Sequence, residues 1–318
     1  MNRVWNKAIA LSRFISSVQK RRVLTLPIYI TNRCTSRCKT CNIWKIKEKE
    51  DLDKDVIESL LCDNEIRDDV EFILTGGDFL LHPECREVVS LFKGKNLRIF
   101  SNGILADKLI SLVREEGVRY VSVSLDGRPE TNKYIRGVDT FKNVERIITE
   151  LKDFTHIEIE YTISKWNTKE DLRFVVDFVK RHKIELSVGY YSRVEYFDAE
   201  EDATGLYSVS DLIASDYHSL YPLWANGKFN LPCYSIFVRP VIKSNGDVEL
   251  CEARQVKLGN LYKRSFSEIW RDERTEEVIR SFSKCNGCWL NCQRTSDLGL
   301  TYIPRRLGLY FHKDVKKE

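Results

Sequence analysis

The chain has 318 residues, of which 42% are hydrophobic and 31% are charged, and its formal net charge is +4. This length can hold one large domain, or one large and one small domain. The composition is that of an ordinary globular protein and argues against a disordered or fibrous chain. The small net charge indicates no particular partner, and no dense basic stripe favours nucleic acid.

No targeting signal is visible in the sequence. Arg3, Lys7 and Arg13 interrupt the apolar core that a signal peptide needs, and no run of eighteen apolar residues predicts a membrane span. Ten cysteines without an export signal indicate metal binding in a reducing compartment rather than disulfides. We therefore expect a cytoplasmic protein, in which the isolated Cys62 and Cys85 are buried core thiols.

The first 190 residues alternate between helical and strand patterns. Residues 3–22 have an amphipathic helical pattern, which we expect to pack on the outside of the main domain. Six apolar runs predict strands: Leu24–Ile30, Val70–Leu74, Leu97–Phe100, Val118–Leu125, Ile157–Ile163 and Ile184–Tyr190. Helical patterns lie between them, at about 53–62, 84–93, 104–115, 139–152 and 168–181. This alternation predicts a parallel α/β sheet, either open and doubly wound or curved into a partial barrel.

The pattern changes after residue 190. A mixture of acidic, aromatic and turn-forming residues predicts a linker with a helix around 208–220. Two later runs, Ile236–Val241 and Asp247–Cys251, predict strands. We accordingly expect an N-terminal helix (1–23), the α/β sheet domain (24–190), the linker (191–230), a small α+β domain (231–296) and a C-terminal tail (297–318).

Three cysteines follow the first predicted strand with the spacing C-x3-C-x2-C, namely Cys34, Cys38 and Cys41. No histidine lies nearby to complete a zinc site, since the first one is His82. A four-iron cluster needs four protein ligands for saturation, so three thiolates would leave one iron open for chemistry. A zinc site or a disulfide stays the alternative at this point.

This spacing resembles the signature of the radical S-adenosylmethionine (SAM) enzymes. In that family the open iron of a [4Fe–4S] cluster binds SAM and cleaves it reductively to methionine and a 5′-deoxyadenosyl radical, which takes a hydrogen atom from a substrate C–H bond. The resemblance implies a partial (β/α)6 barrel of the TIM type, a cluster held by Cys34, Cys38 and Cys41, and SAM as cofactor. It also implies a reductant such as flavodoxin or ferredoxin.

A second match follows the second predicted strand. Gly76, Gly77 and Asp78 resemble the family's Gly-Gly-Glu motif, which holds the amino group of SAM, although the acid is one methylene shorter here. Two glycines at a strand end also allow the backbone to approach a ligand closely. By themselves these three residues would indicate only a turn.

Further polar residues follow the third and fourth strands. The family uses residues at these positions to bind the ribose and carboxylate of SAM, and the corresponding residues are Asn102, Ser122 and Ser124. Arg136, in the loop after strand four, is a candidate clamp for a carboxylate of SAM or substrate. The alternatives are cap or turn roles for the first three and an ordinary exposed side chain for Arg136.

The last third of the chain contains five more cysteines, Cys233, Cys251, Cys285, Cys288 and Cys292. The C-x12-G-x4-C half, with Gly246 in a hairpin turn, resembles the cluster-binding region called SPASM or its shortened form, twitch. A complete SPASM region has seven cysteines, whereas five thiols saturate one four-ligand cluster and leave one over. We expect one auxiliary [4Fe–4S] cluster on Cys233, Cys251 and two of the remaining three, with zinc as the alternative.

The resemblance leaves the outcome of the reaction open. A saturated auxiliary cluster can accept a second electron and give a two-electron oxidation, whereas a spare cysteine can return a hydrogen atom and give an epimerisation. We expect an oxidoreductase acting on a small molecule, because about 23 residues precede the first strand, too few for the leader-binding winged helix of related peptide-modifying enzymes. The alternatives are a peptide maturase, an epimerase, or a zinc- or cluster-stabilised binding or electron-transfer protein.

Overall fold

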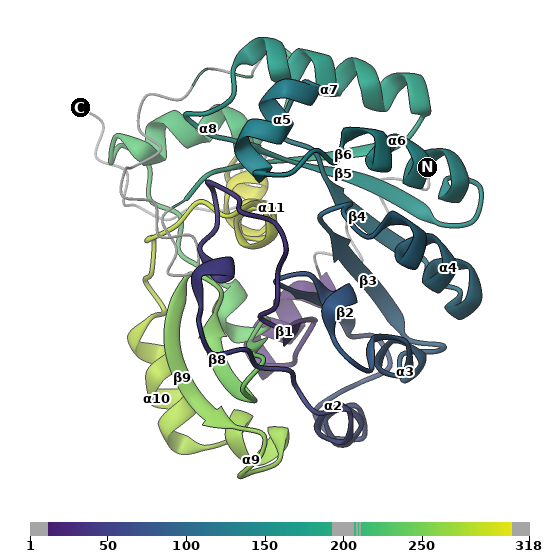
Figure 1. Ribbon diagram of the computed structural model, residues 1–318. Coiled ribbons are helices and arrows are strands. Elements are labelled where there is room, and N and C mark those ends of the chain that lie inside the picture. The colour runs from purple at the N-terminus through teal and green to yellow at the C-terminus, as the bar shows by residue number, and fades with distance from the viewer. Residues whose placement is uncertain (1–11, 193–206, 208, 210, 307–318) are drawn as a thin grey trace.

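The computed structural model describes residues 12–192, 207, 209 and 211–306, the last seven of these by their backbone alone. Its centre is a nine-stranded sheet in the order β6-β5-β4-β3-β2-β1-β7-β8-β9. Neighbours among the first six strands are all parallel. These strands are β1 (Thr25–Thr31), β2 (Glu71–Gly76), β3 (Asn96–Ser101), β4 (Tyr120–Ser124), β5 (His156–Ile163) and β6 (Glu185–Tyr190). Because spatial order follows sequence order, the sheet curves steadily into the predicted partial (β/α)6 barrel (Figure 1).

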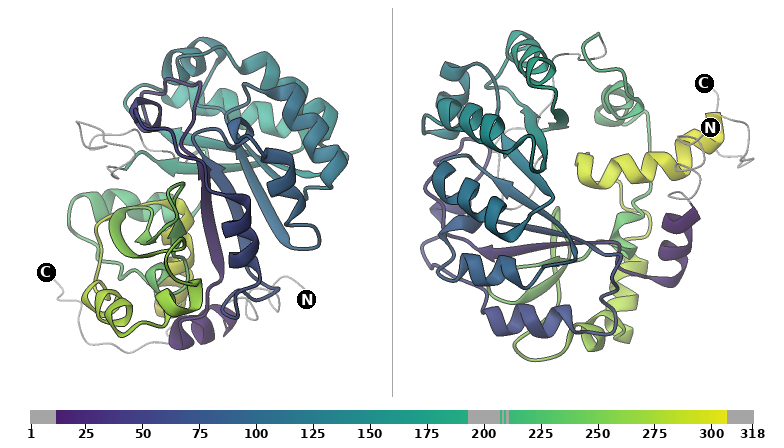
Figure 2. Two further views of the ribbon diagram at one scale, coloured as in Figure 1. Left: turned by 60° about the horizontal axis from the view of Figure 1, so that its bottom comes forward. Right: turned by 90° about the vertical axis from the view of Figure 1, so that its right-hand side faces the viewer.

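Helices cover the outer face of this curved sheet (Figures 1 and 2). The predicted helices are present as α2 (Lys54–Leu61), α3 (Cys85–Ser90), α4 (Ala106–Glu116), α6 (Phe141–Leu151) and α7 (Lys169–His182). An additional helix, α5 (Pro129–Arg136), lies between β4 and α6 where we predicted a loop. Proline at its start and Gly137 in the left-handed conformation at its end delimit these eight residues.

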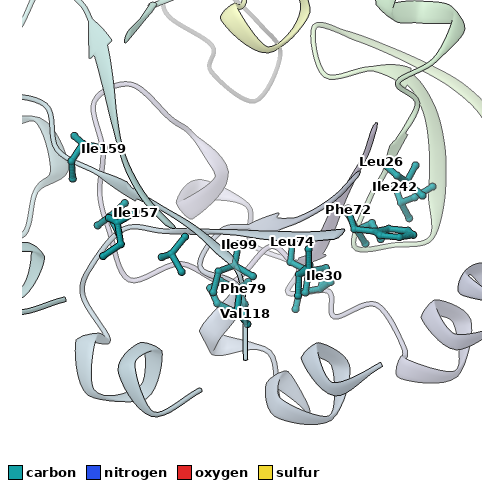
Figure 3. Packing of buried hydrophobic residues seen from close by; sticks show 14 of the residues in the cluster. Leu26, Ile30, Phe72, Leu74, Phe79, Ile99, Val118, Ile157, Ile159 and Ile242 are labelled. Carbon is teal, nitrogen blue, oxygen red and sulfur yellow. The ribbon is translucent and has the colours of Figure 1, made fainter. Parts of the chain in front are cut away.

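Alternation along the strands separates the core from the inside of the barrel. In β5, the odd-numbered residues from Ile157 to Ile163 are buried against the helices. The intervening Glu158, Glu160 and Thr162 point to the other face and line a cavity. Figure 3 shows the apolar side chains packed between the strands and the outer helices. A polar inner face of β5 therefore accompanies a mainly apolar outer one, on which the Tyr161 hydroxyl bonds that of Tyr207 at 2.8 Å.

The C-terminal region extends the same sheet beyond β1. Ile242 of β7 (Val241–Ile242) pairs in parallel with Ile28, and β8 (Asp247–Cys251) and β9 (Arg254–Asn260) continue in antiparallel fashion. The predicted strand Ile236–Val241 is wrong: a 3₁₀ turn occupies Ser235–Phe237, and only Val241 is in a strand. Pro240 explains the difference, because it has no N–H to donate to a strand ladder.

Two helix boundaries also differ from the expectation. In the linker, α8 spans Asp216–Ala225, because the Ser215 side chain caps it by accepting a hydrogen bond from the His218 N–H. Three helices follow β9: α9 (Phe266–Trp270), α10 (Glu273–Ser281) and α11 (Asn291–Arg306). The last of these runs straight through the predicted domain boundary at residue 296, and the buried Arg294–Asp297 ion pair spans that boundary. The predicted tail from residue 297 therefore begins within α11.

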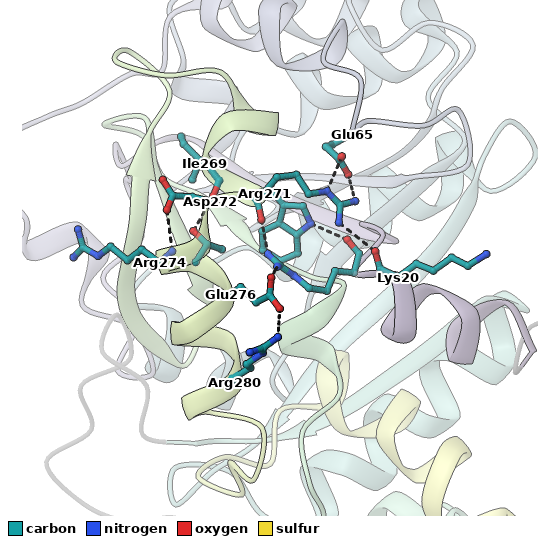
Figure 4. Close-up of polar contacts among 11 residues, drawn as sticks. Lys20, Glu65, Ile269, Arg271, Asp272, Arg274, Glu276 and Arg280 are labelled. Carbon is teal, nitrogen blue, oxygen red and sulfur yellow. Dashed lines mark hydrogen bonds and ion pairs between the residues drawn. The ribbon is translucent and has the colours of Figure 1, made fainter.

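The N-terminal segment packs against the C-terminal region. Residues 12–20 are helical, and the first part of the predicted helix 3–22 lies outside the described residues. The Trp270 indole donates a hydrogen bond to the Arg21 carbonyl at 2.8 Å, and Arg271 pairs with Glu65 after α2 (Figure 4). These contacts connect three regions of the chain. Within the described part of the chain, no helix is long and apolar enough to cross a membrane.

Candidate active site

The three-cysteine loop is attached at its base to the strand that precedes it. Asn32 is buried, and its side chain donates to the Glu48 carbonyl at 2.9 Å and accepts from the Glu50 N–H at 3.1 Å. The Thr31 hydroxyl donates to Asp51 at 2.6 Å. These hydrogen bonds join the two ends of the loop from Cys34 to Glu48, so the base of the loop is held in place without a bound cluster.

Gly76 and Gly77 hold this loop against β2. The Gly77 N–H donates to the Thr31 carbonyl at 2.9 Å, and the Asp78 N–H donates to the Arg33 carbonyl at 2.7 Å. A Cβ atom at either glycine would lie 2.2 Å from a carbonyl oxygen, that of Thr31 for Gly76 and that of Arg33 for Gly77. Only glycine permits this approach, so both residues position the backbone next to Cys34.

Asp78 lies behind the cavity wall, and the residue is 2% exposed. One oxygen caps the following 3₁₀ turn by accepting from the Leu80 N–H, and the other has no partner among the described residues. Burial raises the pKa of Asp78. The two glycines line the cavity whereas Asp78 does not, so the role in SAM binding that we predict for its side chain stays a prediction.

Two predicted residues contact the cysteines directly. The Asn102 amide nitrogen lies 4.0 Å from the Cys34 sulfur, and an Arg136 guanidinium nitrogen lies 3.9 Å from the Cys38 sulfur. Arg136 also pairs at 2.7 Å with Asp126, which is completely buried. Arg136 is therefore no surface arginine: it lies where its positive charge stabilises thiolate ligands.

The remaining two predicted groove residues have different surroundings. Ser124 lines the cavity. Ser122 is fully buried, and its hydroxyl accepts a hydrogen bond from Arg98 at 3.2 Å. It therefore supports Arg98, which itself faces the cavity between Glu71 and Glu158.

The trio opens into a cavity of about 1080 Å³ inside the barrel. Single small-molecule sites typically have about 300–1,000 Å³, so there is room for SAM and a second small molecule. Its described walls include the inner faces of β1 to β6, part of α8 and the start of α11. Polar side chains from the strands meet aromatic ones, namely Tyr190 at the end of β6 and Tyr217 and His218 of α8.

The C-terminal cysteines separate into a group of four and a single residue. Four line one small cavity in the C-terminal region: Cys233, Cys251, Cys285 and Cys288. A hydrogen bond from the Cys233 N–H to the Cys285 carbonyl at 3.0 Å joins the two halves of this group. The expected ligand set of Cys233, Cys251 and two others can therefore be completed with Cys285 and Cys288.

Cys292 faces the barrel cavity instead. Its sulfur lies 3.4 Å from a carboxylate oxygen of Glu252, and the same oxygen accepts from Arg239 at 3.5 Å. All three side chains line the cavity that the trio also lines. Cys292 is exposed toward this cavity. The protein atoms packed around its sulfur, together with the Glu252 carboxylate, raise the pKa of the thiol above its usual value, so it keeps its hydrogen at neutral pH.

The donor chemistry fits multi-iron clusters. Burial raises the pKa of Cys34 to about 11 and that of Cys41 to about 12, so cluster binding has to displace their protons. Among the residues described, no three His, Cys, Asp or Glu side chains are close enough to share one metal ion. Groups made of cysteine thiols alone suit iron–sulfur clusters, whose protein ligands are typically thiolates. When bound, such a cluster with SAM supplies radical chemistry.

Several cavity residues were not predicted from the sequence. Glu158, Glu160 and Arg98 come from strand interiors, where only the alternation of β5 hints at an inward-facing acid. Arg239 and Glu252 have no motif of their own and come together with Cys292 only in the folded chain. The isolated Cys85 is buried as expected, but Cys62 is exposed at the end of α2.

Two family models match the sequence. The radical SAM superfamily matches residues 28–179, and the SPASM iron–sulfur cluster-binding domain matches residues 233–293. Among curated proteins, a probable GTP 3′,8-cyclase of Methanocaldococcus jannaschii is 26% identical over 202 residues, which are 59% of this chain and 63% of that protein. The Fe-coproporphyrin III synthase of Methanosarcina barkeri is 26% identical over 162 residues, 49% of this chain and 40% of that protein. The matches thus span less than two thirds of these relatives.

Solved structures have the same fold. SuiB of Streptococcus suis bound to S-adenosylmethionine superposes with a TM-score of 0.65 at 18% identity, covering 85% of this chain and 72% of that one. The structure titled native anSMEcpe with bound AdoMet and Cp18Cys peptide gives 0.61 at 17% identity, covering 90% and 98%. The chain belongs to the radical SAM superfamily, with a [4Fe–4S] cluster and SAM in its barrel and a SPASM-type domain for auxiliary iron–sulfur binding.

Proposed function

We propose that the protein is a radical SAM enzyme that removes a hydrogen atom from a small polar substrate and returns one from Cys292. The observation that carries this proposal is the division of the five C-terminal thiols. Four line one cavity and can saturate an auxiliary cluster, and the fifth faces the cavity next to the trio. This placement favours the epimerase alternative over the oxidation that we expected from the sequence.

The chemistry of thiols explains the preference. An S–H bond is weaker than most C–H bonds, so a substrate radical within reach of Cys292 takes its hydrogen before it can lose an electron. The overall change in the substrate is then redox-neutral, for example an inversion at carbon. The resulting thiyl radical needs one electron from an external one-electron donor and one proton to become a thiol again. Glu252, 3.4 Å from the sulfur, is placed to hold that proton.

The cavity lining supports a small substrate without a triphosphate. The charged side chains among its described residues are five acids and three arginines: Glu71, Glu158, Glu160, Asp216, Glu252, Arg98, Arg136 and Arg239. Each arginine is already paired with a carboxylate. This lining argues against transferring to this chain the GTP in the names of its curated relatives. Peptide substrates, as in the SuiB complex with its precursor peptide, remain the second candidate class.

Iron counting tests the assignment of the thiols. Anaerobically reconstituted wild type should contain about eight irons per chain and release 5′-deoxyadenosine from SAM under dithionite. Cys251→Ser and Cys285→Ser should each reduce the count to about four, whereas Cys292→Ser should keep about eight. Zinc in place of iron, or an equal loss of iron in Cys292→Ser, would contradict the proposal.

Solvent isotope tests the returned hydrogen. A panel of sugars, nucleosides and amino compounds is incubated with enzyme and SAM in D₂O, because a thiol exchanges its hydrogen with solvent. A substrate of the wild type should gain one deuterium at the attacked carbon. Cys292→Ser should still release 5′-deoxyadenosine but lose this incorporation. A product two electrons more oxidised, formed equally by both proteins, would favour the oxidation that we expected from the sequence.

A further inference from the structure

The loop that carries the trio has a concentration of positive charge that the whole-chain value hides. Residues 33–49 contain six lysines and arginines and one glutamate, a net charge of +5, whereas the whole chain has +4. The other 301 residues therefore sum to −1. The small total charge, which by itself indicates no particular partner, therefore conceals a basic segment.

Most of these cations are exposed and unneutralised. Arg37, Lys39, Lys45 and Lys47 are exposed, and no ion pair involving them occurs among the described residues. Unpaired like charges repel one another, so their concentration in one loop weakens the fold slightly. A partner of opposite charge would remove that cost.

Helix α5 continues this surface next to the trio. The Arg37 and Lys39 N–H groups, on either side of Cys38, donate to the last carbonyls of α5 at 3.1 and 2.8 Å. Tyr134 of α5 is 59% exposed, and the Lys39 ammonium lies 4.3 Å from its ring centroid. Lys133, beside it, has a side chain that is 64% exposed. We call Arg37, Lys39, Lys133 and Tyr134 the α5 surface.

The α5 surface covers the trio from outside. Arg136, three residues after Lys133 and two after Tyr134, reaches inward to the Cys38 sulfur at 3.9 Å. Helix α5 thus has Tyr134 and Lys133 on its exposed side. Arg136 is on the side that faces Cys38. An electron donor that docks here stands one layer of residues from Cys38, and electron transfer slows steeply with distance.

We propose that the α5 surface docks an acidic one-electron carrier protein of the flavodoxin or ferredoxin kind. The carrier gives up one electron and the centre held by the trio gains it, which is the reduction that SAM cleavage requires; the inference rests on the proposed function in this respect. Tyr134 supplies an apolar anchor, and the surrounding cations align an acidic partner.

The test compares two double charge reversals in the reconstituted full-length protein. Lys39→Glu with Lys133→Glu alters the α5 surface. Lys152→Glu with Lys180→Glu makes the same change in net charge away from the α5 surface. Both lysines are exposed and lie at the C-terminal ends of the barrel helices α6 and α7. Binding of a purified flavodoxin is measured by its flavin fluorescence at low and high salt. The rate of 5′-deoxyadenosine release is measured with reduced flavodoxin and, separately, with dithionite.

The first variant should bind flavodoxin about tenfold more weakly at low salt, lose most of the salt dependence, and slow only the flavodoxin-driven reaction. Equal weakening by both variants, or an equal fall of the dithionite-driven rate, would overturn the docking site. So would tighter binding of a duplex oligonucleotide than of flavodoxin to the same residues. Wild type that binds flavodoxin but releases no 5′-deoxyadenosine even with dithionite would refute the proposed function and leave the docking site standing.

Discussion

At the scale of single residues, the two glycines after β2 connect sequence to chemistry most directly. Their resemblance to a SAM-binding motif suggests a ligand contact. The structure adds a second reason for them, because their backbone lies against the carbonyls that lead into Cys34. The motif therefore also holds the cysteine loop in place.

We expect Gly77→Ala to displace this loop. The new Cβ would lie 2.2 Å from the Arg33 carbonyl, far inside contact distance, so Arg33 and with it Cys34 must move. The variant should retain the iron of the auxiliary cluster. It should lose most of the roughly four irons that Cys34, Cys38 and Cys41 would hold. Gly299→Ala is the control, since nothing lies within 4 Å of its added Cβ. Full iron content in Gly77→Ala would show that the loop tolerates the shift.

Glu160 predicts a pH dependence of stability. Burial and the neighbouring Glu158 raise its pKa from 4.5 to about 7, so the folded protein holds this proton more tightly than the unfolded chain. The free energy of unfolding must then fall as pH rises from about 4.5 to 7 and stay level above that. In Glu160→Gln this loss is absent, so its melting temperature should gain on wild type as pH rises from about 5 to 7, with no further gain above pH 7. The exposed Glu130→Gln should show no such gain; if it does, the effect comes from general charge.

At the scale of elements, the start of α11 decides the chemistry of the C-terminal cysteines. Cys288 lies before the helix, in the four-thiol cavity, and Cys292 lies in its first turn, in the barrel cavity. Arg294 holds this junction by donating to the carbonyls of Cys288 and Leu231, each at 2.8 Å. A three-residue spacing thus spans two different sites.

The junction of α9 with the N-terminal segment predicts a strong effect of one side chain. Trp270 is completely buried and bonded to Arg21, so Trp270→Ala should lower the free energy of unfolding by about 3–5 kcal/mol. Arg271→Ala breaks the exposed pair with Glu65 and should cost about 1 kcal/mol or less. Urea unfolding followed by circular dichroism measures both. Similar losses in the two variants would mean that the ion pair stabilises the N-terminal segment as strongly as the indole does.

At the scale of the whole molecule, the cluster-binding region and the barrel share one sheet. The pairing of Ile28 with Ile242 continues the barrel into the C-terminal hairpin, and Ser244 donates to Glu50 at 3.1 Å across the same junction. The base of the three-cysteine loop therefore contacts the C-terminal region, which has the predicted auxiliary-cluster cysteines. The two regions are structurally continuous.

We accordingly expect one cooperative unfolding transition. Far-ultraviolet circular dichroism and tryptophan fluorescence should report the same midpoint in the reconstituted protein, although three of the six tryptophans follow residue 190 and the six barrel strands lie before residue 191. Cys251→Ser, which removes one of the predicted auxiliary ligands, should shift both midpoints together. Two separated transitions would show instead that the barrel and the C-terminal region unfold independently.

Much of the fold and the first half of the site follow from local sequence patterns. The apolar runs predict all six barrel strands. The spacing of Cys34, Cys38 and Cys41 within eight residues predicts a shared site wherever the loop lies. The failures are also local in cause: Pro240 shortens β7, and α5 is too short for its periodicity to be distinguished from a loop.

Only the tertiary structure decides which thiols act together. The five C-terminal cysteines look equivalent along the chain, yet the fold brings four of them to one cavity and turns Cys292 into another, beside Arg239 and Glu252. Spacing constrains distance only within a few residues, whereas strand pairing and the start of a helix determine which distant side chains meet. The sequence by itself thus determined the family's radical chemistry, and the packing of α11 against the barrel determined which residue we propose to complete the reaction.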